Sequence, residues 1–177
     1  MKARMTEVGL FLALVALGVA GRLLPHEPNL TPLVATALFA GFVLRRTPLA
    51  AAVPLASMFL SDAVLGVYDY RVMGVVYLAL MGPVLLGPAL QRRLSVLRVG
   101  AGAVGSSLFF FAATNLAVWL FSGMYAHTLA GLTHCYVAAL PFLRNALVGD
   151  VFWSAALFGA WALVGALRRS DVPSTAA

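Results

Sequence analysis

The sequence predicts an all-α integral membrane protein, one bundle of six transmembrane helices with both termini in the cytoplasm. Its 177 residues are 62% hydrophobic and only 10% charged, against roughly 25% charged residues in ordinary soluble domains. Apolar runs separated by charged or turn-rich breaks supply six candidate spans. Nine of the twelve Lys and Arg residues fall on one side when the N-terminus is placed inside, as the positive-inside rule requires. The net charge of +6 therefore reflects topology and some contact with lipid headgroups, and no nucleic-acid partner is needed.

The predicted spans follow one another closely enough to form a single domain over residues 1–169. They cover about residues 7–24, 32–45, 48–66, 72–90, 99–121 and 141–167. The first run also resembles a signal peptide, but a retained helix keeps the topology of the other spans consistent. Residues 170–177 are polar and small, which predicts a disordered cytoplasmic tail.

The first span carries a stripe of small residues that includes Ala13, Ala16 and Ala20. Small residues three or four positions apart let helices approach closely in lipid. Internal packing and docking of a partner protein explain this stripe about equally well.

The second span is too short for an ordinary membrane crossing, because fourteen residues rise only about 20 Å. Thr31-Pro32 predicts an N-cap followed by proline at the first helical position. The preceding loop would then lie below the outer surface, against protein or a cavity. Helix tilt with local bilayer thinning is the alternative. In the fourth span, Gly82-Pro83 and Gly87-Pro88 predict a kink.

Polar residues of the predicted spans collect on the outer side. Ionisable residues in a membrane are costly unless paired or solvated, so their positions are informative. The predicted site comprises residues near the outer helix ends and in the outer connections: Arg22, His26, Asn29, Asp62, Tyr68, Asn115, Arg144 and Asp150. This one-sided distribution predicts a polar basin open to the outside and closed below by apolar packing. Two structural alternatives remain: Asp62 and Arg144 form a helix–helix ion pair, and Asp150 is protonated or caps a backbone group.

Motifs of known enzymes are missing from the sequence. It contains no metalloprotease, serine-hydrolase or phosphate-binding motif. Its single cysteine, Cys135, rules out an internal disulfide and a multi-cysteine metal site. We therefore expect neither an enzyme nor a resident metal or cofactor.

Several segments resemble a six-span bacterial membrane family related to the S components of energy-coupling-factor (ECF) transporters. They are Gly-Arg22-Leu-Leu-Pro-His26-Glu-Pro-Asn29-Leu-Thr-Pro32, Ser61-Asp62-x-x-Leu-Gly66, Thr114-Asn115-Leu-Ala-Val-Trp119 and Leu140-Pro-Phe-Leu-Arg144-Asn145-x-Leu-x-Gly149-Asp150. The resemblance implies an S-component-like fold in the bacterial cytoplasmic membrane, with a vitamin-sized ligand near the outer face, and it adds Asn145 to the site. It also implies a coupling subunit with two ATPases, docked on the first helix through Ala13, Ala16 and Ala20.

These observations favour a substrate-binding subunit for uptake of a vitamin-like micronutrient. Cobalamin is one candidate, because a related S component ligates cobalt through a cysteine, but Cys135 does not clearly match that position. The alternative is a structural or assembly subunit whose buried polar residues only fix helix packing.

Overall fold

The computed structural model describes residues 2–44 and 47–170, and within these ranges every regular element is an α-helix. The prediction of an all-α protein is therefore confirmed. The seven helices are α1 (Lys2–Leu23), α2 (Leu33–Val43), α3 (Thr47–Leu65), α4 (Tyr70–Ala79), α5 (Met81–Arg92), α6 (Val96–Phe121) and α7 (Leu129–Ser170). The predicted cytoplasmic tail beyond Ser170 and the pair Arg45-Arg46 lie outside the described residues.

Five of the described stretches are long and apolar enough to cross a membrane: α1, α3, α4 with α5, α6 and α7. The sixth apolar helix, α2, has only 11 residues. This set of helices is compatible with a multi-pass membrane protein.

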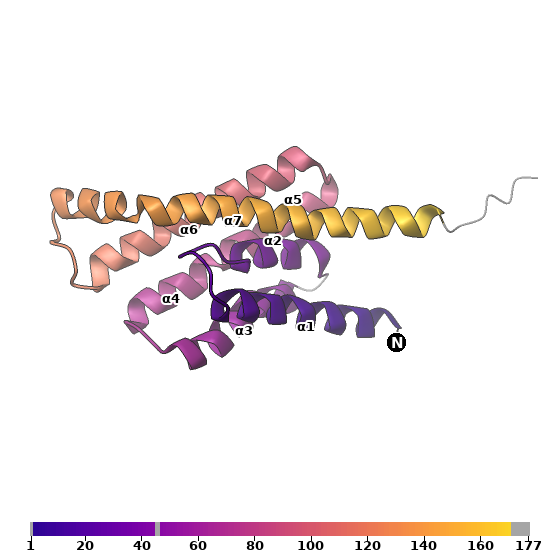
Figure 1. Ribbon diagram of the computed structural model, residues 1–177, viewed down its shortest axis with the longest axis horizontal. Coiled ribbons are helices and arrows are strands. Elements are labelled where there is room, and N and C mark those ends of the chain that lie inside the picture. Colours follow the sequence, from indigo (N-terminus) through magenta and orange to yellow (C-terminus); the bar gives the residue numbers. More distant parts are fainter. Residues whose placement is uncertain (1, 45–46, 171–177) are drawn as a thin grey trace, which may run out of the picture.

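The helices run back and forth along the long axis of the molecule (Figure 1). The first turns of α1 and the end of α7 lie at one end, together with the end of α2, the start of α3 and the α5–α6 connection. We call this the termini end. The α3–α4 and α6–α7 connections lie at the opposite end, which we call the loop end. The chain therefore traverses the bundle an even number of times, with α4 and α5 counted as one traverse.

Helix α2 lies at the centre of the bundle. Nine of its 11 residues are buried, and it packs against α1, α3, α5, α6 and α7. Its approach to α5 is closest where Gly41 meets the Val84 backbone and Gly87 meets the Gly41 backbone. A side chain at either glycine would collide with main-chain atoms that cannot rotate away. The short second helix is thus enclosed by protein.

The start of α2 differs from the prediction. Helix α2 begins at Leu33, with Pro32 in the capping position and no side-chain cap hydrogen bond. Instead, the Pro32 carbonyl accepts a hydrogen bond from the Thr36 N–H at 2.7 Å. Thr31 was predicted as the cap, but its side chain borders a cavity.

The predicted fourth span is divided into two helices at Leu80, whose side chain is fully buried. Pro83 explains the break, because it has no N–H to donate to the carbonyl four residues earlier and its ring crowds that carbonyl, at Ala79. The kink that Gly82-Pro83 predicts is therefore an interruption of the helix.

Helix α7 starts twelve residues before the predicted sixth span, because Pro141 lies inside the helix rather than at its start. The earlier turns are held against α6: Tyr136 donates from its hydroxyl to the Ala112 carbonyl at 2.6 Å, and its ring packs against Phe111. The 42 residues of α7 rise about 63 Å, more than the roughly 40–45 Å of a whole bilayer.

Toward the termini end, apolar side chains of α1, α2, α5 and α7 form a continuous core. The Phe39 ring packs edge-on against Phe158, with ring centroids 5.1 Å apart, and Phe42 packs beside them. This core closes the bundle below the site described next.

Candidate functional site

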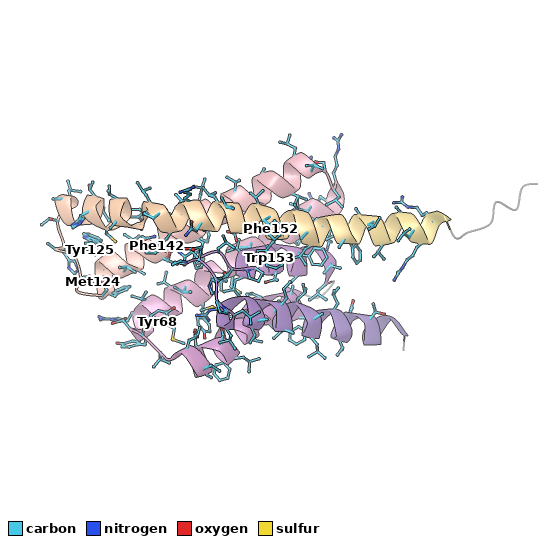
Figure 2. All side chains as sticks on the ribbon, viewed as in Figure 1. Tyr68, Met124, Tyr125, Phe142, Phe152 and Trp153 are labelled. Atoms are coloured by element: carbon cyan, nitrogen blue, oxygen red, sulfur yellow. The ribbon has the colours of Figure 1, made fainter. Side chains whose placement is uncertain are left out.

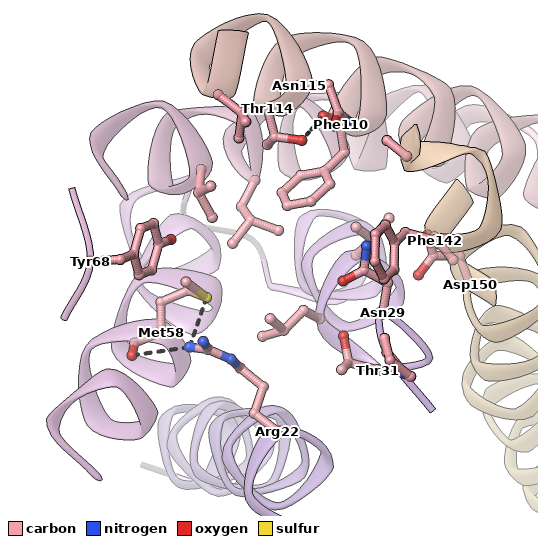
Figure 3. Close-up of a pocket in the computed structure, with 18 of the residues that line it drawn as sticks. Arg22, Asn29, Thr31, Met58, Tyr68, Phe110, Thr114, Asn115, Phe142 and Asp150 are labelled. Carbon is pink, nitrogen blue, oxygen red and sulfur yellow. Dashed lines mark hydrogen bonds between the residues drawn. The ribbon is translucent and has the colours of Figure 1, made fainter. Parts of the chain in front are cut away.

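A cavity of about 650 Å³ occupies the bundle toward the loop end. Tyr68, Met124 and Tyr125 border it and lie near the loop end in Figure 2. Much of the remaining wall is apolar, with Phe110 and Phe142 contributing aromatic rings (Figure 3). Six of the predicted site residues line it: Arg22, His26, Asn29, Tyr68, Asn115 and Asp150.

The Arg22 guanidinium lies on one wall of the cavity and is paired with Asp62 from α3. Its Nη1 is 2.6 Å from Asp62 Oδ1 and donates a hydrogen bond to Ser61 Oγ at 2.6 Å. The Asp62 contact is an ion pair without hydrogen-bond alignment, because Oδ1 has no hydrogen-bond partner among the described residues. The other carboxylate oxygen accepts a hydrogen bond from the Tyr77 hydroxyl at 2.8 Å. Arg22, Asp62 and Tyr77 therefore connect α1, α3 and α4 through one buried network.

This pairing corrects the alternative in which Asp62 pairs with Arg144. Arg144 is exposed on α7 and does not line the cavity. Asp62 is 3% exposed and does not line the cavity either, and it is connected to the cavity through Arg22. The rotation of α7 about its axis places Arg144 away from α3. The position of a residue along its helix, which is all that the sequence indicates, does not define this rotation.

Asp150 lies on the opposite side of the cavity from Arg22 in the close-up (Figure 3). It is 3% exposed, and its Oδ2 is 2.6 Å from the Ser107 hydroxyl of α6. No described basic residue forms an ion pair with it. The two aspartates are thus equally buried but differ in charge compensation.

The α1–α2 loop forms the part of the wall between these two groups. Residues 27–30 make a turn in which the Leu30 N–H donates to the Glu27 carbonyl at 3.0 Å. Pro28 followed by Asn29 at φ 63° fits a type II turn, where asparagine tolerates the left-handed conformation. Asn145 does not line the cavity, and its amide donates to the Pro28 carbonyl at 3.0 Å. It therefore positions the loop.

The α6–α7 side supplies further polar groups. Asn115 donates its amide hydrogen to the Phe111 carbonyl at 2.8 Å, and Thr114 bonds the Phe110 carbonyl in the same way. Cys135, 1% exposed, lies 3.5 Å from the Asn115 carbonyl. Thr114 and Cys135 also line the cavity. The sequence indicates both as polar residues of the outer side but not as ligand contacts, and Cys135, expected in an outer connection, belongs to α7.

Tyr68 borders the cavity from the α3–α4 connection. Burial raises the pKa of its phenol, and the nearby Asp62 carboxylate raises it further, while Arg22 lowers it. Tyr68 is therefore a neutral hydroxyl at physiological pH, able to donate or accept a hydrogen bond.

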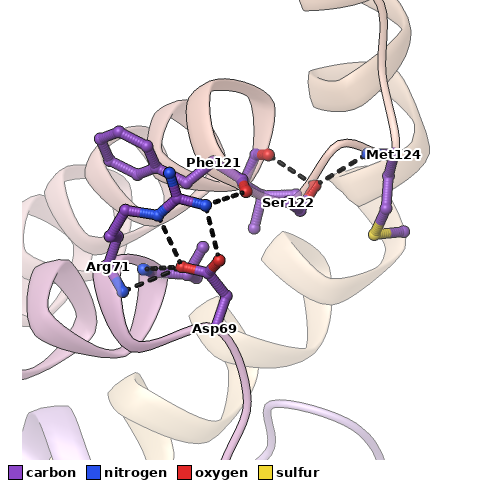
Figure 4. Close-up of polar contacts among 7 residues, drawn as sticks. Asp69, Arg71, Phe121, Ser122 and Met124 are labelled. Carbon is purple, nitrogen blue, oxygen red and sulfur yellow. Dashed lines mark hydrogen bonds and ion pairs between the residues drawn. The ribbon is translucent and has the colours of Figure 1, made fainter.

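A second group of polar contacts joins two helices at the loop end (Figure 4). Arg71 donates to Asp69 Oδ2 at 2.9 Å and to the Phe121 carbonyl at 3.1 Å, which ties the start of α4 to the end of α6. Asp69 also caps α4 by accepting from the Arg71 and Val72 N–H groups. These hydrogen bonds, led by that of the Arg71 side chain, lower the pKa of Asp69 to about 2.

The small residues of α1 separate into two groups. Ala13 and Ala16 are exposed and Ala20 is half-buried, whereas Gly18 faces Ser57 and Gly21 faces Pro32 inside the bundle. Within residues 2–44 and 47–170, no group of three His, Cys, Asp or Glu side chains is placed to hold a metal ion.

Comparison with known proteins gives one family match. No significant match was found among curated proteins or among solved structures. The family model described as "Family of unknown function (DUF6580)" matches residues 2–174, nearly the whole chain. The chain therefore belongs to the DUF6580 family.

Proposed function

We propose that the protein is a substrate-binding membrane subunit for uptake of a vitamin-like micronutrient, of the S-component type, in the bacterial cytoplasmic membrane. The cavity carries this proposal. Its volume of about 650 Å³ falls within the roughly 300–1,000 Å³ typical of small-molecule sites. Aromatic walls with a few polar groups at separate positions are also typical of such sites.

The proposed orientation places the loop end outside and both termini in the cytoplasm. Arg22, Tyr68, Asn115 and Asp150 would contact the ligand, and Asn145 would hold the α1–α2 loop in place. Asp62 would act indirectly, through its pair with Arg22, whereas the exposed Arg144 would not contact the ligand.

Ligand retention through purification tests the proposal. Native mass spectrometry should detect a small molecule bound to the purified wild-type protein. Ala138→Trp should abolish its retention, because Ala138 lines the cavity and an indole would occupy ligand volume. Ala155→Trp is the matched control, since Ala155 is exposed on the same helix outside the cavity. Retention by neither wild type nor control, or equal retention by all three, would contradict the proposal.

Docking of a coupling subunit with ATPases belongs to the same proposal. The exposed face of α1 with Ala13 and Ala16, flanked by Ala20, would allow close approach of a partner helix. Ala16→Leu should leave ligand retention intact while blocking cellular uptake of the identified compound. Ala155→Leu on α7 should affect neither property, and unchanged uptake in Ala16→Leu would remove the docking role.

A second function, a structural or assembly subunit, is favoured by one observation. The Arg22–Asp62 pair and Tyr77 join three helices, which is a packing role in itself. This alternative predicts that the purified protein carries no small molecule and that Ala138→Trp behaves like its control.

A further inference from the structure

The charges around the cavity are unequally compensated. Arg22 is neutralised by Asp62 at 2.6 Å. His26 is exposed and its Nδ1 contacts the Leu24 carbonyl of its own loop. Among the described residues that line the cavity, Asp150 is the sole carboxylic acid. Asp150 is therefore the cavity residue whose carboxylate, once ionised, has no counter-charge in the wall other than one brought by a ligand.

The elements packed against α7 offer Asp150 no cation. Helix α2 contains no titratable residue, and the one basic residue of α6 is the exposed Arg98, nine residues from Ser107. On α7 itself, the nearest basic residue is the exposed Arg144, six positions away and on another face. In the adjoining loop, His26 and Glu27 are exposed. An isolated carboxylate buried in this way costs several kcal/mol, so the neutral acid is favoured.

The hydrogen bonds of Ser107 also fit a protonated Asp150. Ser107 Oγ is 2.6 Å from Asp150 Oδ2 and 3.0 Å from the Ala103 carbonyl. A serine hydroxyl has one hydrogen to donate. Each contact has a hydrogen of its own when Asp150 donates its proton to Ser107 and Ser107 donates to Ala103, whereas an ionised Asp150 would leave both contacts to share the one hydroxyl hydrogen. The other carboxyl oxygen has no partner among the described protein groups and belongs to a residue that borders the cavity.

We propose that the cavity selects an organic cation, whose positively charged nitrogen replaces the proton on Asp150. The inference rests on the proposed function and narrows its substrate class. The exchange is balanced: one O–H bond breaks, one proton leaves to water, and the carboxylate pairs with the ligand cation. Four aromatic rings, those of Tyr68, Phe110, Tyr125 and Phe142, line the same cavity, and aromatic faces attract cations within about 6 Å.

The protonation state is testable without knowing the ligand. Dicyclohexylcarbodiimide modifies protonated carboxyl groups in apolar surroundings. Asp62 serves as an internal control, because both aspartates are 3% exposed and only Asp62 is paired with arginine. Peptide mapping of the treated protein should find modification at Asp150 and none at Asp62, with the Asp150 rate falling as pH rises. Equal modification of both, or none at Asp150 at any pH, would overturn the proposal.

The charge preference is tested with three probes of one shape: tryptamine, the neutral alcohol tryptophol and the acid indole-3-propionate. Tryptamine should protect Asp150 from the carbodiimide, and the other two should not. Because the cation competes with one proton, its affinity should rise about tenfold per pH unit while Asp150 is protonated. Asp150→Asn has no carboxyl group to modify, so tryptamine binding to it is measured by calorimetry, and the pH dependence seen with the wild type should be absent. Equal protection by all probes, or none by tryptamine, overturns the cation assignment.

These results are separable from the proposed function. A neutral or anionic compound retained at purification and lost in Ala138→Trp would leave the uptake proposal standing and overturn the cation proposal. Absence of any retained compound, with tryptamine still protecting Asp150, would leave the cation site standing and count against the uptake proposal.

Discussion

Arg22 and Asp62 are both removed from water, and each depends on the other for its charge. Their side chains are 16% and 3% exposed, with 2.6 Å between the nearest nitrogen and oxygen. Removing one partner leaves the other uncompensated, which is more damaging than replacing both by apolar groups. The pair is therefore a sensitive point for stability as well as for the shape of the cavity wall.

At the residue scale, we expect Asp62→Asn to lower the free energy of unfolding by about 3 kcal/mol, at the low end for a buried pair because Arg22 keeps some exposure. The double replacement Arg22→Met with Asp62→Leu should recover most of that loss. Tryptophan fluorescence during denaturant titration in detergent measures the free energy of unfolding of the single and the double variant. Asp69→Asn, in the more exposed pair with Arg71, is the control. A double variant as unstable as the single one would refute the interpretation.

Residue positions in the sequence predicted the depth of the polar groups but not their partners. Arg22, Asp62, Asn115 and Asp150 lie near the same cavity or one contact away, because hydropathy and topology define depth along each span. The choice between Arg22 and Arg144 as the partner of Asp62 depends on how each helix is rotated about its axis. That rotation is decided by packing between distant segments, which a single sequence does not show.

At the element scale, proline had different effects at different places. Pro83 ends α4 at the buried Leu80, whereas Pro54 and Pro141 lie inside continuous helices. The sequence predicted distortion near Pro83 and a helix start near Pro141, and the second prediction was wrong. Packing of Cys135 and Tyr136 against α6 stabilises the turns before Pro141. Because of this packing, the helix continues although Pro141 has no N–H to donate to the carbonyl four residues earlier.

Gly87 provides a prediction for the α2–α5 contact. Gly87→Ala should destabilise the protein by about 3 kcal/mol or more, because its Cβ would meet the backbone at Gly41 and Phe42. Gly105→Ala in α6 is the matched control: a Cβ there meets nothing within 4 Å, and the change should stabilise by up to about 1 kcal/mol. Thermal unfolding of both variants in the same detergent makes the comparison. Equal unfolding temperatures for the two variants would show that a methyl group fits between α2 and α5 at Gly87.

On the scale of the whole molecule, the two ends of the bundle differ in composition and connection. The described termini share one end, and the cavity lies toward the other. The proposed orientation combines this arrangement with the excess of basic residues on the termini side.

Reporter fusions in cells test that orientation. A fluorescent protein that folds only in the cytoplasm should be fluorescent at either terminus, and alkaline phosphatase there should be inactive. Phosphatase inserted at Gly66 or Gly123, both in loop-end connections, should be active. The opposite pattern would invert the proposed topology and move the cavity to the cytoplasmic face.

The enclosed position of α2 has a consequence for how the protein is made. Eleven residues rise about 16 Å, roughly half the hydrocarbon thickness, so α2 is a poor independent substrate for the insertion machinery. We expect it to enter the membrane as a hairpin with α3, which follows it directly. Its last neighbour, α7, is also the last helix synthesised and carries Asp150. The cavity is therefore completed only at the end of translation, and a chain stopped before α7 would lack the wall that carries Asp150.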